Sequence, residues 1–151
     1  MRQFVVVSAL LVALTSVVAT QAGASQPATA TGSFSFLSDT LTPLRSDGCN
    51  TIFTEDFTVL NTGGLSGVST GSGVLVVHCD GTIWGHGTEV CSACTIDGRT
   101  GDFIDTYTVR ISGANVSGTV AALSATGGLA GLHLQGTFGP GTYSYDYHFD
   151  P

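Results

Sequence analysis

Positive charge is almost absent from this sequence, and lysine is missing altogether. The chain has 151 residues, of which four are arginine and eleven are Asp or Glu, so its net charge is −7 at neutral pH. A surface with so few cations has no basic footprint for nucleic acid or for anionic lipid. We therefore expect neither nucleic acid nor, once the N-terminal segment has been removed, a membrane as a partner.

Long apolar runs are also missing, except at the N-terminus. Arg2 precedes an apolar run over residues 4–19, and small residues follow it, which is the layout of a secretory signal peptide. The run is shorter than the roughly 20 apolar residues that span a membrane. We predict a signal peptide over 1–24, a flexible lead-in over 25–30, and a single secreted domain over 31–151.

Strongly periodic helical stretches are absent from the rest of the chain, which contains most of the 21 glycines. Short alternating runs separated by turn signals predict an all-β barrel or sandwich. Closing the sheet into a barrel would remove the exposed edges that a protein without lysine protects poorly. The strands are expected near residues 31–37, 51–60, 65–70, 73–79, 82–91, 102–112, 115–124, 128–138 and 142–149.

Two Asp-Gly pairs predict tight hairpins, because this dipeptide readily adopts the positive φ angles of a type I′ turn. In "HCDGTI" a two-residue turn sets Val77 opposite Trp84, and in "TIDGRT" it sets Ile96 opposite Arg99. Unbroken strands would then place the following residues on one face of the sheet: Leu75, Val77, Trp84, Tyr107, Val109 and Ile111.

The opposite face would carry Glu89 and Arg110. If that face lines the barrel, Glu89 is the candidate acid or base, because burial raises the pKa of a carboxyl group. The candidate ligand-binding residues are Trp84, Tyr107 and Arg110. The simpler interpretation is that Glu89 and Arg110 are surface charges, because these residue types are rarely buried without a partner.

The segment "TFGPGTY" predicts a third hairpin, in which Pro fixes φ and Gly accepts a positive value. Phe138 then faces Tyr143, and His133 faces His148, with Asp146 on the same side as the histidines. Two imidazoles and a carboxylate are weak candidates for a metal site. The competing interpretation is a polar strip that faces solvent, as expected for one side of a sheet.

Four cysteines in an exported chain predict two disulfides, for which three pairings are open. We favour Cys49–Cys79 and Cys91–Cys94. The second bond requires a turn or a bulge, since positions three apart point to opposite faces of a straight strand. A thioredoxin-like redox site is the rival interpretation of the "CSAC" motif, but the βαβ pattern that it requires is absent.

The glycine-rich segments "TIDGRTGDF" and "GGLAGLHLQG" make the chain similar to a bacterial family of unknown function, which is related in fold to the allene oxide cyclase barrels. The similarity covers roughly residues 31–149. It implies an antiparallel, calycin-like barrel of about eight strands, a size that can hold one small ligand. No catalytic motif of the related cyclases can be placed on this sequence. The matching residues are Ile96, Asp97, Gly98, Arg99, Gly101 and Phe103, then Gly127, Gly128, Leu129, Gly131, Leu132 and Gly136.

Three functions remain open at this point. The first is a non-catalytic module that binds a small apolar ligand or another partner, the second is a barrel cyclase or isomerase, and the third is a structural surface protein whose barrel is filled by its own side chains. No cofactor is expected, and the oligomeric state and the presence of an enzymatic activity stay open. A lumen with room for a ligand would favour the first two functions, and a carboxylate inside an apolar lumen would favour the second.

Overall fold

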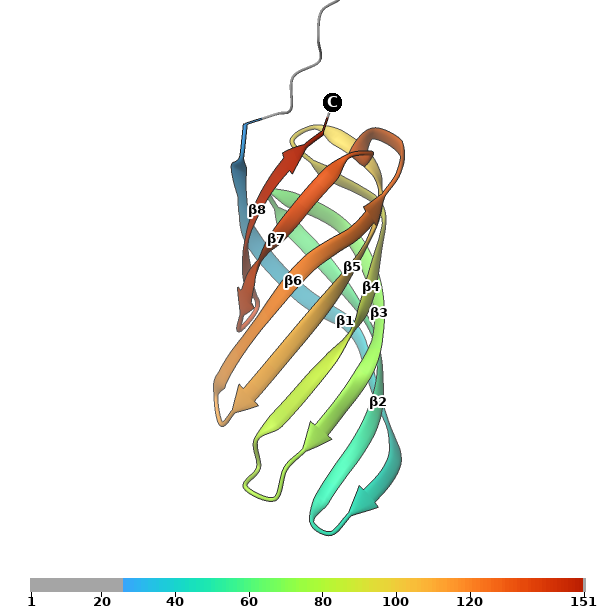
Figure 1. Cartoon of the computed structure of the whole chain (residues 1–151), viewed down its shortest axis with the longest axis vertical. Coiled ribbons are helices and arrows are strands. Elements are labelled where there is room, and N and C mark those ends of the chain that lie inside the picture. The colour runs from blue at the N-terminus through green and yellow to red at the C-terminus, as the bar shows by residue number, and fades with distance from the viewer. Residues whose placement is uncertain (1–25, 151) are drawn as a thin grey trace, which may run out of the picture.

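The computed structural model describes residues 26–150, so the predicted signal peptide lies outside the described residues. Eight strands and one short helix make up the fold (Figure 1). Among the described residues, no helix is long and apolar enough to cross a membrane. The elements are β1 (Ala28–Asp47), β2 (Asn50–Gly63), β3 (Leu65–Val77), β4 (Ile83–Ile96), β5 (Arg99–Ser112), β6 (Asn115–Ala125), the 3₁₀ helix η1 (Gly127–Leu129), β7 (Leu132–Gly139) and β8 (Thr142–Phe149).

The strands form one antiparallel sheet that closes on itself in sequence order, because β1 pairs with both β2 and β8. The prediction of an all-β antiparallel barrel of about eight strands is confirmed. β1 begins at Ala28, earlier than expected, because Ala28 pairs with Tyr147 of β8 and thereby closes the ring. Figure 1 shows an elongated barrel, with the hairpins β1–β2, β3–β4 and β5–β6 at one end and β8 ending at the other.

The two strands expected over 65–70 and 73–79 are in fact one strand, β3. Gly71, between the two expected strands, and Gly73, at the start of the second, make room for aromatic side chains inside the barrel. A Cβ atom on Gly71 would overlap the ring of Phe57, and one on Gly73 would overlap the hydroxyl of Tyr107. The glycines therefore allow packing across the lumen and do not end the strand.

The turn at Asp97-Gly98 is confirmed, with φ angles of 53° and 72°. The prediction for "HCDGTI" is wrong by one residue, because Val77 pairs with Ile83 and not with Trp84. The backbone closes a longer loop there, in which the N–H of His78 donates to the carbonyl of Thr82. A one-residue slip moves every side chain of a strand to the other face.

A β-bulge between Cys91 and Cys94 also interrupts the ladder of β4, and Ala93 within it has a φ of 52°. The bulge turns both cysteines toward the interior, where they are fully buried and bonded to each other. The N–H of Ala93 donates to the exposed carboxylate of Asp102, which holds the bulge in place. The bulge that the disulfide requires is therefore present.

The favoured disulfide pairing is confirmed for both bonds. Cys49–Cys79 joins the tip of the β1–β2 hairpin to the β3–β4 loop across 30 residues of sequence. Disulfides persist mainly in oxidising compartments, so the two bonds agree with secretion.

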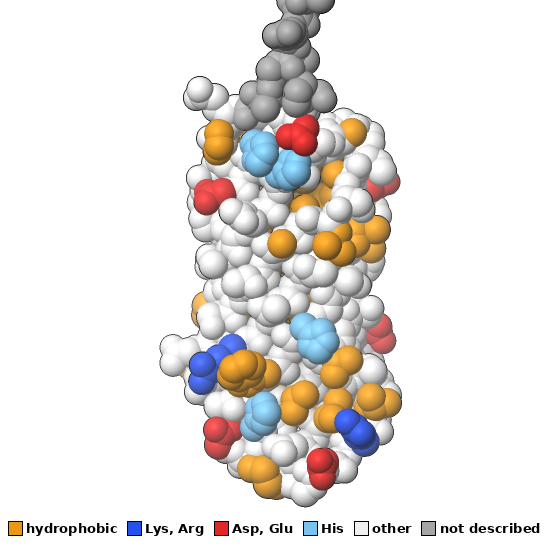
Figure 2. Space-filling model, viewed as in Figure 1, with side chains coloured by type: hydrophobic (Ala, Val, Ile, Leu, Met, Phe, Trp, Pro, Cys, Tyr) orange, Lys and Arg blue, Asp and Glu red, His pale blue; other side chains and the backbone are white. Residues whose placement is uncertain are grey.

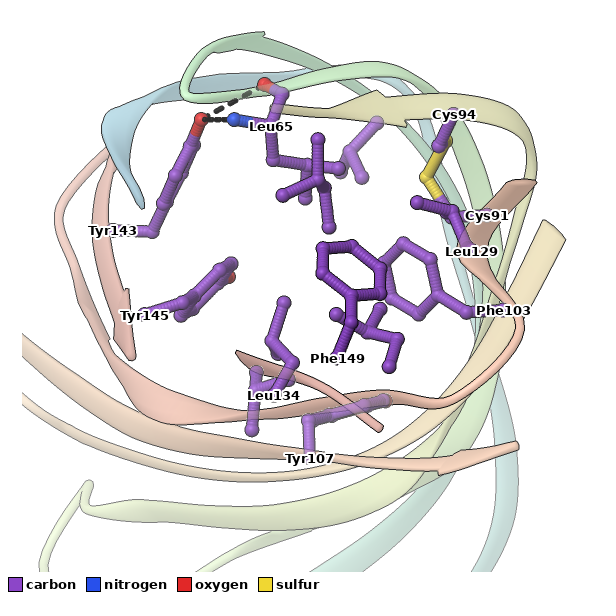
Figure 3. Packing of buried hydrophobic residues seen from close by; sticks show 14 of the residues in the cluster. Leu65, Cys91, Cys94, Phe103, Tyr107, Leu129, Leu134, Tyr143, Tyr145 and Phe149 are labelled. Carbon is purple, nitrogen blue, oxygen red and sulfur yellow. Dashed lines mark hydrogen bonds between the residues drawn. A yellow bond between two sulfur atoms is a disulfide. The ribbon is translucent and has the colours of Figure 1, made fainter. Parts of the chain in front are cut away.

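The end of the barrel next to η1 is filled by a packed core (Figure 3). Leu129 of η1 is fully buried there, in the same cluster as the buried rings of Phe103 and Phe149 (Figure 3). The hydroxyl of Tyr143 accepts from the N–H of Leu65 and lies 2.8 Å from its carbonyl oxygen, so this polar group is satisfied. The core closes one end of the barrel and confines any ligand to the other part of the lumen.

Candidate functional site

A cavity of about 240 Å³ lies inside the barrel, between the packed core and the end that carries the long hairpins. Its walls are mainly aromatic and aliphatic, and Phe36, which is 53% exposed, lies at its margin. The residues that line it are Phe34, Phe36, Asp39, Glu55, Phe57, Val59, Asn61, Leu75, Glu89, Tyr107, Val109, Ile111, Val116, Val120, Phe138 and Tyr145.

Two carboxyl groups lie side by side on neighbouring strands, one in the lining of the cavity and the other beside it. Glu89 of β4 pairs directly with Asp105 of β5, so their side chains point to the same interior side. Burial, opposed by a hydrogen bond from Ser69, raises the pKa of Glu89. Burial and the neighbouring Glu89 raise the pKa of Asp105 to about 8. Like charges held close cannot both ionise easily, so this pair retains a proton near neutral pH.

Asp105 is only 3% exposed, and its Oδ1 atom has no hydrogen-bond partner among the residues that the structure describes. A buried polar atom without a partner costs free energy, and native proteins contain few of them. Groups of this kind concentrate at functional sites. Asp105 is therefore the strongest single indication that this part of the barrel does more than support the fold.

Two more carboxyl groups line the cavity, Asp39 of β1 and Glu55 of β2. Glu55 of β2 accepts a hydrogen bond of 3.1 Å from the hydroxyl of Tyr107. Burial raises the pKa of Glu55, the hydrogen bond from Tyr107 lowers it, and Asp39 raises it further. The pKa of Tyr107 is raised by burial and by the charge of Glu55, so the phenol stays protonated and donating. Glu55 can therefore still accept further hydrogen bonds from a ligand in the cavity.

The remaining polar groups in the lining provide few free donors. The side-chain amide of Asn61 donates to the hydroxyl of Ser69 at 2.9 Å, and both residues are buried. No Arg, Lys or His is among the residues that line the cavity. The interior is therefore apolar, rich in acceptors and acidic, with no cation of its own to balance the carboxyl groups.

The structure corrects the predicted faces of β4. Glu89, expected to share a face with Arg110, points into the barrel, whereas Arg110 points outward. Trp84, expected beside Tyr107, is 52% exposed on the outer surface, where the guanidinium of Arg110 lies 5.1 Å from its ring centroid. Trp84 and Arg110 line an open outer depression of about 1000 Å³, and only Tyr107 of the three predicted ligand-binding residues lines the lumen.

Two residues of this site were not selected from the sequence, although the alternation contained a signal for both. Asp105 lies two residues from Phe103 and two from Tyr107, so it shares the side of the strand on which Tyr107, Val109 and Ile111 were expected. Glu55 has the same spacing from Phe57. A carboxylate in phase with buried aromatic residues on a strand indicates an interior acid.

The register of the β7–β8 hairpin is confirmed, including His133 opposite His148 and Phe138 opposite Tyr143. The imidazole rings are stacked, with centroids 4.6 Å apart. Asp146 is not the carboxylate nearest to them, because it accepts a hydrogen bond from Thr29 at 2.8 Å. Asp150 takes that place, with its Oδ2 atom 2.8 Å from Nε2 of His133.

Comparison with known proteins identifies the fold and no function. No family model matches the chain, and no curated protein sequence matches it. A solved structure from Shewanella oneidensis MR-1, described as a protein of unknown function from the DUF3224 family, is similar with a TM-score of 0.64. The similarity covers 83% of this chain and 99% of that chain at 18% sequence identity. At this identity, the likeness shows that the two proteins share an all-β fold.

Proposed function

We propose that this protein is an exported barrel that binds a small molecule in its lumen, and that the ligand has an apolar body and a protonated amine. The observation that carries the proposal is the set of carboxyl groups at the cavity, with no Arg, Lys or His in the lining: Asp39, Glu55 and Glu89 line the cavity, and Asp105 lies beside Glu89. A filled structural barrel would leave no such cavity. The acids cost stability in the empty protein, and a cationic ligand would offset that cost.

The charge of the ligand follows from the hydrogen-bonding groups that it would meet. Glu55 and Glu89 can only accept once they are ionised, and Tyr107 already donates to Glu55. A carboxylate ligand would add a like charge, whereas an ammonium group would donate to several acceptors and favour their ionised forms. The faces of Phe57 and Tyr107 at the cavity wall can add cation–π attraction.

The size of the ligand follows from the cavity volume of about 240 Å³. An apolar cavity of about 150 Å³ holds benzene, and drug-sized ligands occupy about 300–1,000 Å³. A single ring with a short amine chain therefore fits, and a steroid or a long acyl chain does not. We also propose that the barrel is of the allene oxide cyclase type, or calycin-like, as the strand number and the ligand-sized lumen suggest.

The test compares three molecules that share one skeleton, namely 2-phenylethylamine, 2-phenylethanol and phenylacetate, by calorimetric titration of the tag-free mature chain. We expect binding of the amine, weaker binding of the alcohol and none of the carboxylate. Removing one partner of a buried charge pair costs at least about 2 kcal/mol, so E89Q should weaken amine binding about 30-fold or more.

The matched control is D56N, because Asp56 follows Glu55 on β2 but is exposed on the outside of the barrel. D56N should bind the amine as the unmodified protein does. Equal binding of phenylacetate, no binding of any of the three molecules, or unchanged amine binding by E89Q would each overturn the proposal.

A second function is favoured by one arrangement, the cross-strand pair of Glu89 and Asp105 beside an apolar cavity, in which burial raises the pKa of both carboxyl groups. A base with a raised pKa can remove a proton from the carbon next to a carbonyl group and return it at another position, which is the chemistry of an isomerase. The cavity-lining Glu89 would be the base that removes the proton and returns it, and Asp105, whose pKa is raised to about 8, would stay protonated beside it. This alternative predicts deuterium exchange from D₂O into a small cyclic ketone such as cyclohexanone, with loss of the exchange in E89Q.

A further inference from the structure

A second group of chemically active side chains lies on the outside of the barrel, on the outward face of β7 and β8, whose inward face supplies Phe138 and Tyr145 to the lumen cavity. It consists of His133 on β7, His148 on β8 and Asp150 just after β8. One ligand atom from each of the three residues lies within 4.8 Å of the others. Figure 2 shows two histidine side chains and an acidic side chain gathered on the surface near the upper end of the barrel.

The backbone fixes the positions of all three residues. His133 and His148 are direct cross-strand partners in the β7–β8 ladder, and their rings are parallel within 3°. The N–H of Asp150 donates to the carbonyl of Gly131 at 2.8 Å, so the pairing of the two chains continues past the end of β8. The three side chains therefore start from one short piece of sheet, and bringing them together requires little further ordering.

The distances describe a hydrogen-bonded pair and a second imidazole nearby, an arrangement of ligand atoms that a metal ion could also join. Nε2 of His133 lies 2.8 Å from Oδ2 of Asp150, and Nε2 of His148 lies 3.9 Å from Oδ1 of the same carboxylate. The Nε2 atom of each imidazole therefore lies near the carboxylate of Asp150. Zn²⁺ binds imidazole nitrogen and carboxylate oxygen at about 2.0–2.2 Å, and a tetrahedral site brings its ligand atoms to separations that small side-chain rotations would reach here.

We propose that His133, His148 and Asp150 bind a divalent transition-metal ion, with Zn²⁺ as the ion that this donor set suits best. Two imidazoles and one carboxylate favour Zn²⁺, Cu²⁺ or Ni²⁺ over Ca²⁺ and Mg²⁺, which prefer oxygen ligands. Three protein ligands leave one position open for water or for a group from another molecule. The site is independent of the lumen, so its failure would leave the proposed amine binding untouched.

The test uses the tag-free mature chain and two metal probes. Co²⁺ reports the site through the visible absorption of the bound ion, and Zn²⁺ is then titrated against it. Loss of a single outer-sphere partner weakens metal binding about 10–100-fold, so H133N and H148N should each weaken Zn²⁺ binding by at least about that factor. D150N should weaken it by a smaller but clear factor.

Two variants serve as matched controls. D146N changes the other exposed aspartate that lies two residues from His148, and H86N changes an exposed histidine elsewhere on the surface. Both should bind Zn²⁺ as the unmodified protein does. The proposal is overturned if Co²⁺ gives no absorption band, if H133N and H148N bind Zn²⁺ with unchanged affinity, or if D146N loses as much affinity as D150N.

Discussion

Replacing Asp105 with asparagine should make the protein more stable near neutral pH. The carboxyl group is 3% exposed, its Oδ1 atom has no partner among the described residues, and burial together with Glu89 raises its pKa from 3.8 to about 8. Between these two values the folded chain holds the proton and the unfolded chain has lost it. The unfolded state then binds fewer protons, so stability falls as the pH rises.

The size of this effect follows from the pKa difference. One pKa unit corresponds to about 1.4 kcal/mol, and about pH 7 lies roughly three units above the pKa of the unfolded state. The buried carboxyl group of Asp105 therefore lowers the free energy of unfolding by roughly 4 kcal/mol at about pH 7. This figure is an upper limit, because movement of the side chain and entry of water reduce the cost of a buried charge. We therefore expect D105N to be about 2–4 kcal/mol more stable than the unmodified protein at about pH 7, and equally stable at about pH 4.

The assay is urea unfolding of both proteins at several values between about pH 4 and 8, with D56N as an exposed control that should follow the unmodified protein. The reasoning is refuted if the stability of the unmodified protein does not fall over this range. It is also refuted if D105N destabilises the protein by the same amount at every pH, which would indicate a packing role alone.

Two further predictions concern the disulfide that joins the hairpins and the outer depression. Replacing both Cys49 and Cys79 with alanine should lower the free energy of unfolding by about 3–4 kcal/mol, because the bond closes a loop across 30 residues. Both cysteines are exposed, so little packing is lost. Urea unfolding would measure this loss, and a loss below about 1 kcal/mol would contradict the prediction. Replacing Trp84 with alanine should leave the binding of 2-phenylethylamine unchanged, since this side chain lies outside the lumen; a marked loss in the calorimetric titration would place the ligand on the outer surface.

The sequence was sufficient to predict the register of the β7–β8 hairpin, although β7 begins at Leu132 and the expected start at residue 128 lies in η1. Alternation there is unbroken, and Gly141 takes the positive φ of 68° that the Gly-Pro-Gly loop requires. The pairing of the four cysteines was also predicted, as was the Asp97-Gly98 turn. These features depend on local chemistry, namely turn residues and the side-chain period of two.

The face of β4 could not be predicted by treating it as a straight strand. Counting back from the Asp97-Gly98 turn places Ile96 and Cys94 correctly inside, but the bulge adds one residue before Cys91 and reverses every position beyond it. For that reason Trp84 lies outside and Glu89 inside. The need for a bulge between Cys91 and Cys94 was visible in the sequence. The bulge reverses the faces of the rest of β4, and this reversal directs Glu89 into the barrel.

The most direct test of the central claim is a crystal structure of the protein with 2-phenylethylamine. We predict the ring in the lumen cavity, against the two rings of Phe57 and Tyr107, which contact each other edge to face, and the ammonium group within hydrogen-bond distance of Glu89. An occupied outer depression beside Trp84 with an unoccupied lumen, or an ammonium group that points away from the acids, would contradict the account.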